Sequence, residues 1–258
     1  MKYAVREGLL GADLSLEEKF RRAADLGFDG IELIPRRDGN FHGMMAFEQE
    51  GRDELLGLCE EYSMEISSLS LALYREDNCL TTDEDEWQAG KALLLRSIEA
   101  ADALGCAGIL LPHFGPMEPK LDDPRLEPDL RGIREATEQS GTDLVMCVEC
   151  TVDLATMQGI VETADHPQVG IYFDMGNLKS AGQDPAAMIR ALGTAGVKMV
   201  HAKEAGADLL GEGEVDLQAI ADALEAIGYD EWMVFETAPT DDPLHAIEHN
   251  LRVLRRYM

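Results

Sequence analysis

Positive charge is scarce in this sequence of 258 residues. Only 22 side chains are Lys or Arg, against 50 Asp and Glu, which gives a formal net charge of −28 at pH 7. A surface of that sign repels nucleic-acid phosphates and acidic membranes before any specific contact forms. We therefore expect no nucleic-acid partner and no membrane partner. Abundant acid with few lysines also suggests a surface kept hydrated in high salt, although an ordinary acidic protein has the same composition.

Long apolar runs and a paired set of cysteines are also missing. No stretch approaches the roughly 18 uncharged apolar residues of a membrane-spanning helix, and the opening MKYAVREGLL lacks the apolar run of a signal peptide. The five cysteines are odd in number. Cys147 and Cys150 stand three apart in a strand-like run, so they point to opposite faces and do not share one ion. We expect a cytoplasmic protein with reduced thiols.

What the sequence does contain is an alternation of strand-length apolar runs with helical patterns, which is typical of stacked βαβ units. The capping box Ser15-Leu-Glu-Glu18 marks one helix start, and Thr82-Asp-Glu-Asp85 opens a long helix that ends at Leu104-Gly105. The irregular stretch 113–129 is expected to form a loop over the active face. Since eight strands in about 250 residues close an α/β barrel, we predict one (β/α)₈ TIM-barrel domain over residues 1–258. The predicted strands are Tyr3–Val5, Gly30–Leu33, Glu65–Leu71, Gly108–Pro112, Leu144–Glu149, Val169–Phe173, Val197–His201 and Met233–Glu236.

Polar side chains end the last four predicted strands. Glu149 ends LVMCVE, Asp174 follows VGIYF, His201 ends VKMVH and Glu236 ends EWMVFE. Residues at the carboxyl ends of barrel strands converge on the top of the pore. Three carboxylates and an imidazole in one place repel one another unless a cation neutralises them. The sequence therefore predicts a site for one divalent metal ion.

Oxygen-rich ligands with one imidazole suit Mn²⁺, Mg²⁺ or Co²⁺, and Zn²⁺ stays open as well. The alternative interpretation is that the four residues are separate helix caps and ion pairs, which is common for a single carboxylate at a strand end. Four such residues on consecutive strands favour the metal site.

The chain resembles the sugar phosphate isomerase/epimerase family, the xylose isomerase-like barrels that include ketose 3-epimerases, hexulose-phosphate isomerases and inosose dehydratases. The resemblance covers nearly the full length. It rests on LGFDGIEL (26–33), the Glu149 strand, FDMGN (173–177), His201-Ala-Lys-Glu204, GEGEVD (211–216) and Glu236. It implies that Glu149, Asp174, His201 and Glu236 hold the metal, and that the two glutamates act as acid and base on opposite faces of a sugar.

The sequence departs from the free-ketose epimerases of this family at three positions. Asn177 stands where they carry a histidine, and Ala155 and Ala207 stand where they place an additional glutamate and arginine. The form Asp174-Met-Gly-Asn177 looks more like the pentulose- and hexulose-phosphate members, which favours a phosphorylated ketose. Glu204 replaces the more common aspartate of the H-x-K-D motif.

Four residues are candidates for contact with the substrate: Asn177, His113, Glu204 and Glu32. Two of them have competing interpretations. His113 directly follows the fourth strand, where a histidine equally serves to hydrogen-bond a loop. Glu32 ends the second strand, from which it can reach the substrate, support a metal ligand, or pair with Arg36 or Arg37.

These features predict a metal-dependent isomerase or epimerase that acts on a ketose or ketose phosphate through an enediolate. Its partner is a small-molecule sugar, and a homo-oligomer is left open. The first alternative is a dehydratase or lyase of the inosose dehydratase type, which also begins with proton abstraction beside a carbonyl. A repair endonuclease on the same barrel is disfavoured by the net charge and by the few His and Glu ligands. A non-catalytic sugar-binding barrel is disfavoured by the complete ligand set.

Overall fold

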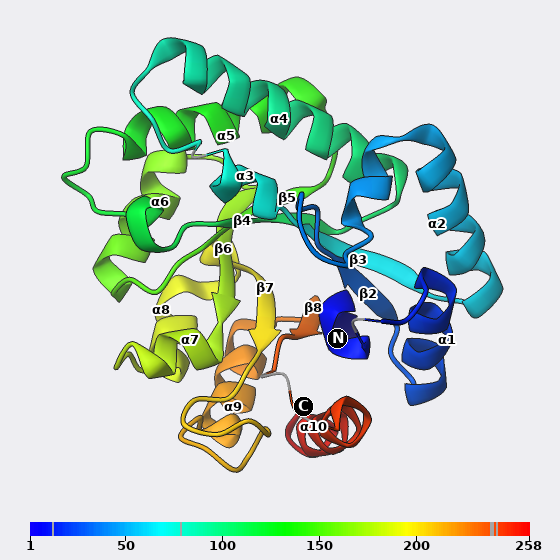
Figure 1. The fold of residues 1–258 in the computed structure, drawn as a ribbon. Coiled ribbons are helices and arrows are strands. Elements are labelled where there is room, and N and C mark those ends of the chain that lie inside the picture. The colour runs from blue at the N-terminus through cyan, green and yellow to red at the C-terminus, as the bar shows by residue number, and fades with distance from the viewer. Residues whose placement is uncertain (12, 78, 238–239, 241) are drawn as a thin grey trace.

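Eight parallel strands form a closed barrel in sequence order, and helices surround it (Figure 1). The computed structural model describes residues 1–11, 13–77, 79–237, 240 and 242–258. The predicted (β/α)₈ architecture is confirmed. The strands are β1 (Lys2–Arg6), β2 (Gly30–Leu33), β3 (Glu65–Ser70), β4 (Gly108–Pro112), β5 (Val145–Glu149), β6 (Val169–Asp174), β7 (Val197–Ala202) and β8 (Trp232–Phe235).

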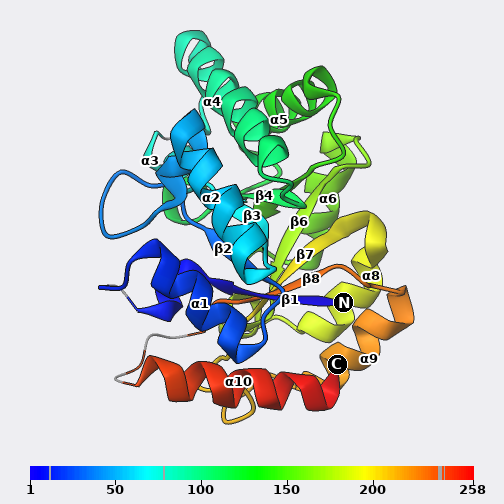
Figure 2. The same ribbon diagram turned by 90° about the vertical axis from the view of Figure 1, so that its right-hand side faces the viewer.

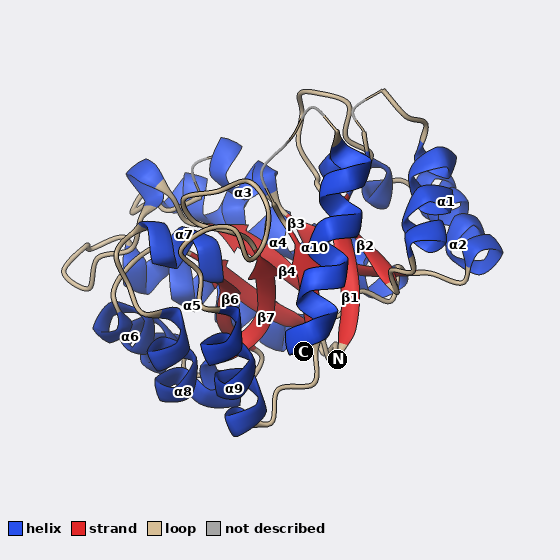
Figure 3. Ribbon diagram, turned by 90° about the horizontal axis from the view of Figure 1, so that it is seen from below, coloured by secondary structure: helices blue, strands red, loops and turns tan. Residues whose placement is uncertain are grey.

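The helices fill the connections between strands and form the outer layer. The α-helices are α1 (Leu16–Leu26), α2 (Gln49–Tyr62), α3 (Ala72–Glu76), α4 (Glu84–Ala103), α5 (Leu126–Ser140), α6 (Leu154–Ala164), α7 (Met175–Ser180), α8 (Pro185–Gly196), α9 (Leu217–Ile227) and α10 (Pro243–Tyr257). In Figure 3, α10 lies in front of the strands, with α1 and α2 to its right and α6, α8 and α9 to its left. Short 3₁₀ segments are η1 (Glu7–Leu10), η2 (Gly43–Phe47) and η3 (Gly115–Met117).

Helix α10 closes the ring of helices beside α1 (Figure 2). There the guanidinium of Arg255 donates a hydrogen bond to the carbonyl of Gly27 at 2.7 Å. Within the described ranges, no helix combines the length and the apolar character that a bilayer crossing requires.

The helix starts follow local capping chemistry. The capping box of α1 is confirmed, because Ser15 Oγ accepts the N–H of Glu18 and the Glu18 carboxylate accepts the N–H of Ser15. The stretch Thr82-Asp-Glu-Asp85 opens α4 as predicted. Asp83 is the N-cap, and its carboxylate accepts the N–H groups of Asp85 and Glu86. A carboxylate at this position satisfies two free donors and complements the helix dipole.

The irregular stretch after β4 is shorter than predicted. It contains η3, and α5 already begins at Leu126.

The barrel has two apolar layers. The larger one lies between the strands and the helices. A smaller cluster consists of Ala4, Leu110, Cys147, Tyr172, Met199, Trp232 and Val234, all of them strand residues. Strands buried on both faces need nearly continuous apolar sequence, and β6 is accordingly buried along its whole length. The small cluster fills the pore and forms the floor of the site.

Candidate metal centre

The polar residues of the site stand two positions beyond residues that fill the pore. Side chains alternate along a strand, so a residue and the one two places further point to the same side. The pore residues concerned are Ala4, Cys147, Tyr172, Met199 and Val234. The residues two places further are Arg6, Glu149, Asp174, His201 and Glu236. The barrel therefore presents these five side chains as one polar layer above its apolar filling.

Four of the five form a cluster with the geometry of a metal site. One potential ligand atom from each of Glu149, Asp174, His201 and Glu236 lies within 4.8 Å of the others. His201 Nδ1 is 3.5 Å from Glu149 Oε1, 3.9 Å from Asp174 Oδ2 and 2.8 Å from Glu236 Oε2. The structure thus brings together the four residues that the sequence selected as ligands.

In the described part of the chain, the facing atoms of this cluster have no hydrogen-bond partner outside the cluster itself. Among the described residues, the buried and unpartnered side-chain atoms include Glu149 Oε1, Asp174 Oδ2, His201 Nδ1 and Glu236 Oε2. Buried polar atoms are normally satisfied, and each exception needs an explanation. A divalent cation coordinated by these four atoms would satisfy all of them at once. The donor set of three carboxylates and one imidazole suits Mn²⁺, Mg²⁺, Co²⁺ or Zn²⁺.

Without a cation, two of the carboxyl groups hold their protons more strongly than an ordinary carboxyl group does. Burial raises the pKa of Glu149, and the charge of Glu236 adds to this rise. Burial, followed by the charges of Glu236 and Glu149, raises the pKa of Asp174 to about 7. Crowded carboxylates disfavour one another's ionised forms. A cation that binds here would therefore displace protons.

Glu236 is held in the ionised state by His201 and by two cations, Arg6 and Lys203, that are not among the predicted site residues. Burial alone would raise the pKa of Glu236, but Arg6, His201 and Lys203 together lower it. Arg6 Nη1 forms an ion pair with Glu236 Oε1, and Lys203 Nζ lies 3.7 Å from the same oxygen. Arg6 ends β1 just as the ligands stand at the ends of their strands, and this position in the sequence is the signal that points to it.

Glu32 supports the imidazole of the cluster. Its carboxylate is completely buried and lies 3.1 Å from His201 Nε2. It also accepts hydrogen bonds from Ser68 Oγ at 2.8 Å and from Tyr172 Oη at 2.9 Å. A carboxylate on one ring nitrogen fixes the histidine tautomer and leaves the other nitrogen free for a metal.

Neither of the arginines weighed as partners of Glu32 pairs with it. Arg36 pairs with Asp38, and Arg37 pairs with Glu76 and Asp77.

Asn177 lies at the edge of the cluster. It lines the cavity described below, and its backbone N–H donates to Asp174 Oδ1 at 2.7 Å. Asp174 is therefore the N-cap of α7 through one oxygen, while the other oxygen faces the cluster.

His113 and Glu204 lie outside the cavity lining and have structural partners. The His113 ring is buried, with Nδ1 3.0 Å from the Leu111 carbonyl and Nε2 3.0 Å from Asp129 Oδ2. The Glu204 carboxylate accepts the backbone N–H groups of three residues in the loop before α9. Both side chains use their polar atoms to hold loops, so we do not propose that they contact substrate.

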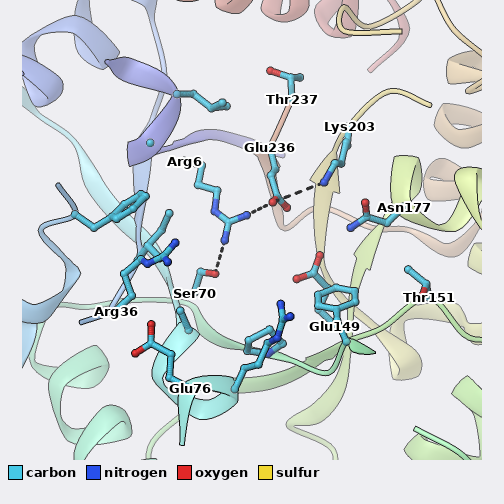
Figure 4. A pocket seen from close by; sticks show the side chains of 18 residues that line it. Arg6, Arg36, Ser70, Glu76, Glu149, Thr151, Asn177, Lys203, Glu236 and Thr237 are labelled. Atoms are coloured by element: carbon cyan, nitrogen blue, oxygen red, sulfur yellow. Dashed lines mark hydrogen bonds and ion pairs between the residues drawn. The ribbon is translucent and has the colours of Figure 1, made fainter. Parts of the chain in front are cut away.

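A cavity of about 840 Å³ opens above the cluster. Of the four cluster residues, Glu149 and Glu236 line it, whereas Asp174 and His201 lie below its surface. Figure 4 shows both glutamates beside Arg6, Ser70, Lys203 and Asn177, with Arg6 joined to Ser70 and Glu236. A volume of this size suits a small ligand.

Several solved structures share this fold. The chain is 16% identical to D-allulose 3-epimerase from Methylomonas sp. in complex with D-allulose, with a TM-score of 0.82 over 100% of this chain and 97% of that one. It is 20% identical to 3-keto-D-glucoside 4-epimerase from E. coli, with a TM-score of 0.74 over 99% of each chain. It is 15% identical to the IOLI protein with a bound zinc atom, with a TM-score of 0.78 over 100% and 99% of the two chains.

No curated protein matches the chain in sequence. A family model described as xylose isomerase-like TIM barrel matches residues 20–257. That match covers most of the chain, including every residue of the metal cluster, and we conclude that the protein belongs to the xylose isomerase-like TIM barrel family.

Proposed function

We propose that this protein is a divalent-metal-dependent isomerase or epimerase that acts on a ketose or ketose phosphate through an enediolate. One observation carries the proposal: two carboxylates of the metal cluster, Glu149 and Glu236, also line a sugar-sized cavity. The epimerases with this fold, among them one whose structure contains D-allulose, support it at the level of reaction class.

The cluster would supply the activation of the substrate. A divalent ion held by Glu149, Asp174, His201 and Glu236 would polarise a carbonyl and the neighbouring hydroxyl, and so acidify the C–H between them. We propose that the ion is one of Mn²⁺, Mg²⁺, Co²⁺ and Zn²⁺, all of which suit this donor set.

The protein's own residues then handle the proton. Glu149 extends from β5 and Glu236 follows β8, so they approach the cavity from different strands (Figure 4). A carboxylate on each side of a bound sugar can remove a proton from one face and return it to the other. Arg6 and Lys203 contact Glu236 and place positive charge where an enediolate would form.

Turnover in D₂O tests the proposal. We expect deuterium on the carbon next to the substrate carbonyl, and we expect Glu149→Gln and Glu236→Gln each to abolish turnover while the fold is kept. Glu54→Gln, which removes an exposed carboxylate on α2, is the matched control. Because both glutamates are also proposed metal ligands, the variants are assayed with excess Mn²⁺ and their bound metal is measured.

A variant that binds metal again and epimerises at a near wild-type rate would show that its glutamate is only a ligand. Deuterium uptake accompanied by loss of water, with no new ketose, would move the assignment to a dehydratase of the inosose dehydratase type.

A further inference from the structure

The cavity wall is positively charged although the protein is strongly acidic. The charged residues that line it are Arg6, Arg36, Arg75, Lys203, Glu76, Glu149 and Glu236. Two of the three carboxylates belong to the metal cluster. Outside the cluster, four cations therefore face a single carboxylate, in a chain that carries −28 overall.

Two of the cations reach the cavity from the side opposite the cluster. Arg36 follows β2, and Arg75 lies on α3 directly after β3. The cluster comes from β5 to β8. In a closed barrel of eight strands, β2 and β3 face β6 and β7 across the pore. A substrate whose carbonyl lies at the cluster would therefore extend its far end toward these two arginines.

Both guanidinium groups are available to a ligand. Arg36 stacks on Phe41, with 5.1 Å from its central carbon to the ring centroid, and pairs with Asp38 at the exposed rim. Such surface pairs contribute little, so a bound oxyanion can replace Asp38. Arg75 is exposed, and no carboxylate in the described ranges lies within 4.0 Å of its nitrogens. Glu76, the remaining carboxylate of the wall, pairs with Arg37.

A buried network fixes the helix that carries Arg75 relative to the metal cluster. Tyr74, the preceding residue, donates its hydroxyl hydrogen to Asp129 Oδ1, and His113 Nε2 lies 3.0 Å from Asp129 Oδ2. The backbone N–H of His113 donates to the carbonyl of Glu149 at 2.8 Å. The two ends of the cavity are thus held at a set separation by contacts that involve no ligand.

We propose that Arg36 and Arg75 form an oxyanion subsite, which binds a phosphate ester or carboxylate at the end of the ketose remote from the metal cluster. This inference rests on the proposed function and narrows its substrate to an anionic sugar. The guanidinium fork matches the paired oxygens of either group. An uncharged sugar would leave Arg75 without an anionic partner at that end and Arg36 with only its exposed pair to Asp38.

The test compares matched six-carbon ketoses on the Mn²⁺-loaded full chain. Fructose, fructose 6-phosphate and fructuronate differ only at the remote carbon, and the same series is run on the tagatose skeleton. Dissociation constants are measured by calorimetry, and deuterium uptake from D₂O is measured in parallel. The variants are Arg36→Gln and Arg75→Gln. Arg252→Gln, which removes an exposed charge from α10, is the control.

We expect the wild type to bind one of the two anionic members at least about tenfold more tightly than the neutral sugar. Each cavity variant loses that advantage, the affinity for the neutral sugar stays within about twofold, and the control keeps the wild-type pattern. The member that responds identifies the oxyanion as phosphate or carboxylate.

Equal binding of neutral and anionic sugars by the wild type would overturn the subsite. So would an anion preference that survives both variants, because the anion would then bind at the metal. Arginine-dependent binding without deuterium uptake would keep the subsite and contradict the isomerase function. Uptake into neutral and anionic sugars with equal KM would keep the function and contradict the subsite.

Discussion

The two halves of the barrel mouth differ in how their polar groups are satisfied. On β5 to β8, the facing atoms of Glu149, Asp174 and His201 have no hydrogen-bond partner outside the cluster in the part of the chain that the structure describes. On β2 and β3, Glu32 accepts from Ser68, and Ser70 accepts from Arg6 on β1. In the β2–β3 half, the polar groups already satisfy one another by hydrogen bonds. In the β5–β8 half, the ligand atoms would be satisfied by a bound cation. Changes in the β5–β8 half should therefore affect metal binding more than changes in the β2–β3 half.

The largest effect is expected from Asp174→Asn in the unsatisfied half. An amide removes the charge and the anionic donor, so Mn²⁺ affinity should fall by more than about a hundredfold, beyond the range found for supporting residues. Asn is also a good N-cap, which keeps the start of α7 intact. Calorimetric titration measures the effect, with Asp184→Asn at the N-cap of α8 as the matched control. An unchanged Mn²⁺ affinity would remove Asp174 from the ligand set.

A smaller effect is expected from Glu32→Gln in the β2–β3 half, where the polar groups are already hydrogen-bonded. The amide still fills the space but no longer fixes the tautomer of His201 through a charge, and Mn²⁺ affinity should fall by about 10- to 100-fold. Ser68→Ala, which removes one of the hydrogen bonds to Glu32, should cost less. If Glu32→Gln weakens binding as much as Asp174→Asn, the contrast between the two halves is wrong.

The third comparison is between the protonated and the ionised forms of Asp174, because a proton competes with the metal ion for this carboxylate. The pKa of Asp174 is about 7 without a cation, because of burial and the charges of Glu236 and Glu149. Below that pH, Mn²⁺ must displace a proton, so its affinity should fall by about tenfold per pH unit and level off above.

The effect of Asp174 on the stability of the metal-free protein has a definite sign. The folded state holds the Asp174 proton up to about pH 7, whereas the unfolded chain releases it near 3.8. The contribution of Asp174 to the free energy of unfolding therefore decreases as pH rises through this window. Thermal melts of wild type and Asp174→Asn between pH 4 and pH 8 measure it. Parallel curves for the two proteins would contradict the raised pKa.

The smallest effect is expected from salt. It acts on the acidic surface, where carboxylates repel one another, more than on the interior, where charged groups are paired. Raising salt from about 0.1 M to 1 M shortens the screening length from about 10 Å to about 3 Å and relieves repulsion among surface carboxylates. The melting temperature should rise by a few degrees, which for a domain of this size corresponds to about 1 kcal/mol. A flat or falling curve would remove the high-salt hypothesis and leave the fold untouched.

Much of the architecture could be predicted from the sequence, because it depends on local periodicity. Each predicted strand overlaps an observed one, with ends that agree or differ by one residue, as at β8. The helix start predicted at Thr82-Asp-Glu-Asp85 also depends on local chemistry, and Asp83 in that stretch is the N-cap of α4.

In the candidate site, too, some residues could be predicted from the sequence and others could not. Glu149, Asp174, His201 and Glu236 could be selected from the sequence because each ends a strand, and parallel strands bring their ends to one rim. Arg6 also ends a strand, but a guanidinium does not bind metal ions, so the pattern of metal ligands does not include it. His113 and Glu204 lie next to the site in sequence, yet their side chains turn to Asp129 and to backbone N–H groups.

By itself, the sequence determined the barrel, the order of its strands and the four residues that converge on the metal cluster, because strand alternation and strand order are local rules. Only the tertiary structure decided which side chains surround that cluster. Glu32 and His201 are 169 positions apart, and barrel closure places them 3.1 Å from each other. Arg36 and Arg75 likewise share one cavity with Glu149 only after the strands close. Such contacts depend on rotamers and loop packing across the barrel, which no pattern along the chain records.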